Sequence, residues 1–173
     1  MLYSAIDIAN FFVNRAIEAG HPLTPLQVGK LTFLAHGWNL GINEMSLINE
    51  PVQAWKWGPV IPSVYFAFQP YGKDPIDKAA KDFVEKESDI EPNASIFDTD
   101  AETKSLLETI YQEYAKYGGS ELTNITHMNG SPWEITVRPY KGKELPRFLT
   151  IKNALIQDYY RQKAQTNEQA TEH

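Results

Sequence analysis

Helix-start signals recur along this chain and restrict its fold class more than any other feature of the sequence. In such a signal, a side-chain oxygen accepts a hydrogen bond from one of the first free backbone amides of a helix. An acidic residue or a side-chain amide follows three residues later. Ser4 begins one such pair, and Thr24 begins another that encloses Pro25, a residue favoured in a first turn. Further helix starts are expected at Thr99, Ser120, Ser131 and Thr150.

The apolar residues between these starts follow the helical period, so helices account for most of the expected fold. One segment departs from that period: residues 51–58 alternate as a short strand does, between a proline and a glycine. A short helix is expected over residues 62–68 and a weaker one over 76–86. We therefore expect a mainly α fold, a compact multi-helix domain with a small β-hairpin around residues 52–57. Residues 4–164 are expected to form one domain, and 165–173 a polar, frayed tail.

Charge is distributed unevenly along the chain. The whole sequence has a net charge of −6, with 16 basic and 22 acidic residues. Residues 74–102 hold ten acids against three lysines, and the part from Glu87 to Asp100 is the best candidate for a mobile connection. Residues 138–163 hold seven basic residues against two acids. The sequence leaves open whether these are ordinary solvated segments or surfaces that steer a partner of opposite sign.

Composition excludes several classes of protein. Cysteine is absent, which removes disulfides, thiol nucleophiles and cysteine zinc sites, and favours the cytoplasm. The net negative charge argues against nucleic-acid binding as the main function. No apolar stretch approaches the roughly 18 residues that cross a bilayer, so no membrane association is expected.

Two histidines, His36 and His127, lie inside predicted helices among apolar neighbours. Neither has a His, Asp or Glu three or four residues away, the spacing at which helical metal ligands occur. The sequence also lacks a glycine-rich phosphate loop and a nucleophile elbow. We therefore expect no enzyme activity and no cofactor or metal, although a His-dependent metal hydrolase stays an alternative.

Tryptophan gives a stronger indication of function. Trp55, Trp57 and Trp133 lie next to prolines, glycines or turns, where a rigid aromatic ring suits a binding surface. An equally ordinary reading is that these rings fill gaps between short helices and the hairpin. Trp38 lies on the apolar face of the second helix and is expected in the core.

Three stretches together resemble the SocA-like antitoxin family, also called the Panacea domain and often labelled phage-associated or prophage proteins. They are TPLQVGKLTFLAHGW at 24–38, EPVQAWKWGPVIPSVYFAFQPYG at 50–72 and LTNITHMNGSPW at 122–133. The chain departs from the family pattern at Val28 and Gly29, where a lysine and a long apolar residue are usual. The resemblance covers about residues 4–160 and implies a mostly helical fold with a small hairpin.

The resemblance implies an antitoxin that neutralises a protein toxin by direct binding, the toxin being encoded by a neighbouring gene. An alternative is an adaptor that delivers the bound toxin to an ATP-dependent protease. The oligomeric state and any contact of residues 74–100 with a partner are left open. No catalytic residues come with the resemblance, and the candidate interface and motif positions are His36, Trp38, Trp55, Trp57, Gly58, Pro59, Pro62, Tyr65, His127, Pro132 and Trp133.

Overall fold

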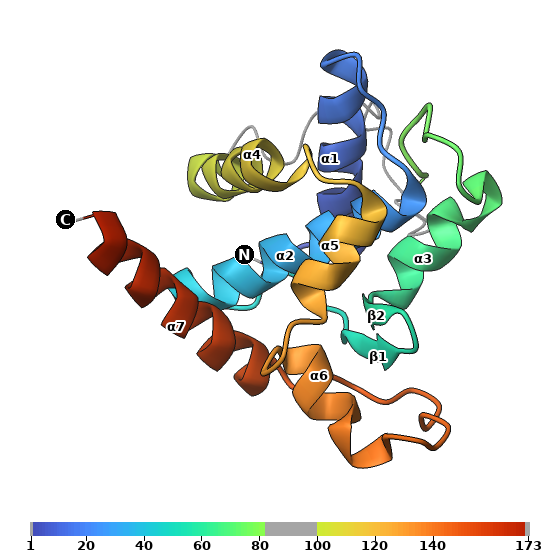
Figure 1. Ribbon diagram of the computed structural model, residues 1–173. Helices are drawn as coiled ribbons and strands as arrows, with labels where there is room; N and C mark the ends of the chain where they lie inside the picture. The colour runs from blue at the N-terminus through green and yellow to red at the C-terminus, as the bar shows by residue number, and fades with distance from the viewer. Residues whose placement is uncertain (1, 82–99, 172–173) are drawn as a thin grey trace.

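The computed structural model describes residues 2–81 and 100–171, and helices form most of it (Figure 1). A two-stranded antiparallel hairpin completes the fold, so the mainly helical prediction is confirmed. Short 3₁₀ turns follow two of the helices, at Gln69–Tyr71 and at Arg138–Tyr140. The elements are α1 (Ala5–Glu18), α2 (Pro25–Asn43), β1 (Gln53–Trp55), β2 (Gly58–Val60), α3 (Pro62–Phe68), α4 (Ala101–Tyr114), α5 (Gly119–Thr126), α6 (Pro132–Val137) and α7 (Asn153–Thr171).

Helix α2 is the centre of the molecule, with α1, α4, α5 and α7 packed around it (Figure 1). Its start is as predicted: Thr24 and Gln27 form a capping box around Pro25. Because neighbours surround it, α2 is buried on more than one face. Gly37 and Gly41 face Tyr160 of α7, and the absence of their side chains lets the two helices approach closely.

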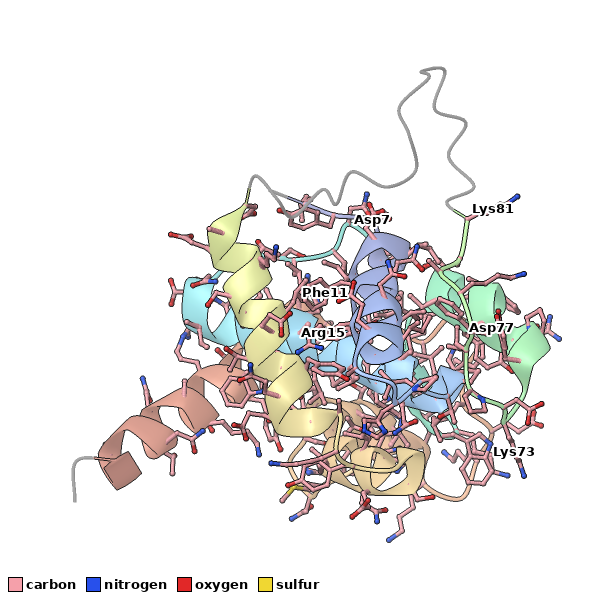
Figure 2. All side chains as sticks on the ribbon, turned by 90° about the horizontal axis from the view of Figure 1, so that it is seen from above. Asp7, Phe11, Arg15, Lys73, Asp77 and Lys81 are labelled. Carbon is pink, nitrogen blue, oxygen red and sulfur yellow. The ribbon has the colours of Figure 1, made fainter. Side chains whose placement is uncertain are left out.

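Helices α1 and α4 are joined by an ion pair on their facing surfaces. The Nε atom of Arg15 lies 3.1 Å from Oε1 of Glu108, and the guanidinium lies over the ring of Tyr111. Figure 2 shows Arg15 and Phe11 on the side of α1 that faces α4. This contact therefore links α1 to α4 at a partly exposed position.

The hairpin joins the two halves of the chain. Ala54 pairs with Pro59 in the β1–β2 register. On its other edge, β1 is bonded to a later segment, because the amide of Ala54 donates to Leu149 at 2.7 Å and that of Ile151 donates to Val52 at 2.8 Å. Residues 149–151 therefore run beside β1.

Several predicted helix starts shift by a few residues. Ser4 and Ser131 cap α1 and α6 as predicted. The cap of α4 is Asp100, whose carboxylate accepts from the amide of Thr103; Thr99 lies outside the described residues. Gly118 precedes α5, so Ser120 lies within that helix. Thr150 forms a bridge with Gln53, and α7 begins three residues later at Asn153.

Residues 76–81, the described part of the weak helix predicted over 76–86, are not helical. Tertiary hydrogen bonds take their place: the amide of Ile76 donates to Leu23, and the side chain of Asn10 bonds both the amide and the carbonyl of Ala80. Residues 82–86, and most of the connection expected from Glu87 to Asp100, lie outside the described residues.

The polar C-terminal segment, expected to be frayed, continues α7 as helix to Thr171. In residues 2–81 and 100–171, no helix has both the length and the apolar character needed to cross a membrane.

Candidate partner-binding site

A buried lysine of α2 holds the hairpin turn from inside. Lys30 is 2% exposed, and its Nζ atom donates to the carbonyls of Trp57 at 3.0 Å and Pro59 at 3.3 Å. Burial lowers the pKa of this amine to about 7. Lys30 is not among the positions predicted from the sequence. The signal that could have found it is a lysine among the apolar residues of a buried helix.

Gly58 lies where two helices meet the hairpin turn. Its φ of +111° is one that side chains rarely adopt, and a Cβ there would lie 2.7 Å from Nε2 of His127 and closer still to Nζ of Lys30. His127 of the α5 end and Lys30 of α2 thus converge on the turn. Burial, and then the charge of Lys30, lower the pKa of His127 below its usual range.

The corner before α6 supports the same turn from the other side. The ring of Trp133 stacks on His127, with centroids 3.7 Å apart and planes 7° from parallel. Its Nε1 donates to the carbonyl of Trp55 at 2.8 Å. Buried Pro132 begins the helix that carries this ring. The structure therefore brings Trp55 together with His127 and Trp133, which lie more than 70 positions later in the sequence.

Three rings gather on the outer side of this support, and we call Trp55, Tyr65 and Phe66 the aromatic cluster. The Trp55 ring lies 4.9 Å from that of Tyr65 and 6.4 Å from that of Phe66, centroid to centroid. Tyr65 is 42% and Phe66 59% exposed. The chain offers no obvious local signal for Phe66, because its exposure depends on how α3 docks after Pro62.

Exposed cations flank the hairpin on the β1 side. Trp57 at the turn is 69% exposed, with Nζ of Lys56 5.0 Å from its ring centroid. The segment that returns beside β1 is basic, and its Phe148 is 78% exposed. Within the described part of the chain no carboxylate forms an ion pair with the exposed side chains of Lys56, Lys141, Lys143, Arg147 or Lys152.

Two of the predicted positions lie away from this surface. His36 is fully buried, and its Nε2 lies 3.3 Å from Oδ1 of Asn153 at the start of α7. Trp38 donates from Nε1 to the hydroxyl of Tyr114 at 3.0 Å and packs against Tyr160. Both side chains join α2 to its neighbouring helices.

His36 and His127, the pair in the metal-hydrolase alternative, have separate partners. His36 contacts Asn153, whereas His127 stacks on Trp133. Among residues 2–81 and 100–171, no group of three or more His, Asp or Glu side chains is placed to hold a metal ion. Nothing in the described geometry supports that alternative.

The burial of His36 makes stability depend on pH. Desolvation lowers its pKa to about 4, against about 6.5 in an unfolded chain. Between pH 7 and pH 5.5 the unfolded chain takes up a proton here that the folded chain does not, so acid removes stability. We expect this histidine to account for a loss of about 1 kcal/mol in the free energy of unfolding over that range.

Urea unfolding of the wild type and His36→Gln at both pH values checks this expectation. Glutamine keeps a polar group beside Asn153 but does not titrate, so the variant should lose about 1 kcal/mol less than the wild type on acidification. Equal losses would show that His36 is not the group responsible.

The family model described as "Antitoxin SocA-like, Panacea domain" matches residues 28–134, a range that contains every candidate position named above from the sequence. Among curated proteins, "Antitoxin SocA" of Caulobacter vibrioides (strain NA1000 / CB15N) is 29% identical over 158 residues. That alignment covers 89% of this chain and 80% of the relative. No solved structure matches the chain.

Proposed function

Because this chain belongs to the SocA-like antitoxin family with the Panacea domain, we propose that it is the antitoxin of a toxin–antitoxin pair and silences its toxin by direct binding. Similarity to "Antitoxin SocA" over most of that relative supports the antitoxin role. The observation that carries the binding mechanism is the exposed aromatic cluster. We expect binding, and not catalysis, to be the activity.

The aromatic cluster has the properties of a binding hot spot. Large rings with few rotatable bonds remove much apolar surface from water and lose little conformational entropy when they dock. The hairpin beneath them is already fixed, because Lys30 bonds the turn and Trp133 bonds Trp55. A partner therefore meets a preorganised surface, which lowers the entropic cost of binding.

Co-expression with the product of the neighbouring gene tests this proposal. We expect that product to arrest growth alone, and to be harmless and to co-purify when this chain is present. Phe66→Ala should weaken the complex about 30-fold, the scale of a hot-spot residue. Because Phe66 is 59% exposed, the fold should be little changed. Growth scoring and calorimetric titration give the two measurements.

Ile42→Ala is the matched control. Ile42 is 55% exposed and lies near the C-terminal end of α2, away from the hairpin. This variant should bind within about threefold of the wild type, since Ile42 lies outside the aromatic cluster, in a separate hollow that it lines with residues of α4. A wild-type chain that neither rescues growth nor binds the toxin would rule the proposal out.

Delivery of the toxin to an ATP-dependent protease stays the alternative mechanism. Residues 165–167 are exposed near the end of α7, and such a projecting segment suits contact with a second partner (Figure 1). Removal of residues 166–173 separates the two mechanisms. If blocking the toxin is sufficient, the truncated chain still rescues growth and the half-life of the toxin is unchanged. If delivery is required, binding persists while degradation and rescue are lost.

A further inference from the structure

A cavity of about 230 Å³ opens beside the aromatic cluster, between the first turns of α2, strand β2 and helix α3. Tyr65 belongs both to the cavity wall and to the aromatic cluster, so the two features form one continuous surface. Residues of the wall include Leu26, Gly29, Val60, Ile61, Tyr65 and Gln69.

Gly29 is a helix-interior glycine that the fold itself does not require. A Cβ added there would meet no atom within 4 Å, in contrast to Gly37 and Gly41 of the same helix. Glycine is also among the poorest helix formers, so it weakens α2 without relieving any crowding in the described structure. Its physical effect is to leave the cavity wall open.

The size of the cavity favours a single side chain over a metabolite. Pockets for small molecules usually measure about 300–1,000 Å³, and this one is smaller and lined mainly by apolar residues. Leu26 is 46% exposed and Tyr65 42% exposed at its wall. An apolar side chain that entered would bury these two as well as itself.

The residues around the aromatic cluster favour a negatively charged partner. On the edge of the hairpin opposite α3, Arg147 and Phe148 precede the residues that pair with β1. A positively charged flank results from Arg147, from Lys56 of the turn and from Lys141, Lys143 and Lys152, none of which forms an ion pair with a described residue. A negatively charged partner surface would be attracted to it and would approach in the matching orientation.

We propose that the cavity is the anchor pocket for the toxin: an apolar side chain from an acidic segment of the toxin enters it and packs against Leu26, Gly29 and Tyr65. Acidic residues beside that anchor face the cations of the hairpin flank. This inference rests on the proposed antitoxin function and identifies the chemistry that its site recognises.

Filling the cavity tests the anchor directly. In calorimetric titrations with the neighbouring gene's product, Gly29→Leu should weaken binding at least 30-fold, because its side chain occupies the space of the anchor. Gly29→Ala, which adds one methyl group to the same wall, should weaken binding less than Gly29→Leu, so that the loss grows with the volume added. Urea unfolding of both variants shows whether they remain folded, as the open space at this position leads us to expect.

The charge preference has its own readout. Lys56→Glu combined with Arg147→Glu should slow association about tenfold at low salt and flatten the salt dependence of the association rate.

Undiminished toxin binding by Gly29→Leu would overturn the anchor pocket while leaving the antitoxin function in place. An unchanged association rate in the double variant would overturn the inference that the toxin segment is acidic. A wild-type chain that fails to bind the toxin would remove both the proposed function and this inference.

Discussion

Gly58→Ala is expected to lower the free energy of unfolding by about 4 kcal/mol, the sum of backbone strain and overpacking. The alanine backbone would have to adopt a φ of +111°. Its added methyl group would overlap Nε2 of His127 and Nζ of Lys30. The lysine end could move away only by breaking its hydrogen bonds to the carbonyls of Trp57 and Pro59. Because those bonds fix the hairpin, toxin binding should also fall.

Gly142→Ala separates strain from overlap. Gly142 has a φ of +79°, yet a Cβ there would meet nothing within 4 Å. This variant should lose only about 1 kcal/mol, the cost of placing an L-residue in the left-handed region. Urea unfolding followed by tryptophan fluorescence measures both variants. Equal losses would show that the convergence of Lys30 and His127 on the turn does not matter for stability.

Gly41→Ala is expected to lower the free energy of unfolding by about 2 kcal/mol, within the usual range for overpacking. A Cβ on Gly41 would lie 2.6 Å from the backbone carbon of Tyr160 and 2.8 Å from the amide nitrogen of Arg161. These are backbone atoms, which cannot rotate aside as a side chain does. Helix α7 would have to move outward, which would loosen the packing of the buried Tyr160 ring.

Gly29→Ala in the same helix should change the free energy of unfolding in the opposite direction. With open space around the new methyl group, the variant gains helix propensity, worth about 1 kcal/mol of added stability. Thermal or urea unfolding of the pair checks both values. Destabilisation by both variants would mean that Gly29 has a packing role in the fold, and destabilisation by neither would mean that the α2–α7 contact yields easily.

Local signals in the sequence predicted the helix starts at Ser4, Thr24 and Ser131. Each cap is a hydrogen bond between groups about three residues apart, so the information lies within one turn. Proline and glycine marked the hairpin and α3 for the same reason. The resemblance to the SocA-like family, carried by three continuous motifs, predicted the class of function from the same local information.

Predictions failed where distant groups competed with a local pattern. Residues 76–81 carry apolar residues at helical spacing, but Leu23 and Asn10 take the hydrogen bonds of Ile76 and Ala80. Thr150 resembles a helix cap, but it pairs with Gln53 nearly a hundred positions earlier. Tertiary contacts decide such segments because a marginal helix gains more from packing than from propensity.

The arrangement of the candidate site depends on tertiary structure throughout. Only the folded chain places Nζ of Lys30 between the carbonyls of Trp57 and Pro59, and Nε1 of Trp133 on the carbonyl of Trp55. The sequence separations of these three contacts are 27, 29 and 78 positions. The cavity beside Gly29 likewise exists only where three elements meet. A sequence displays which groups can bond within a turn, whereas long-range partners follow from how the buried faces pack together.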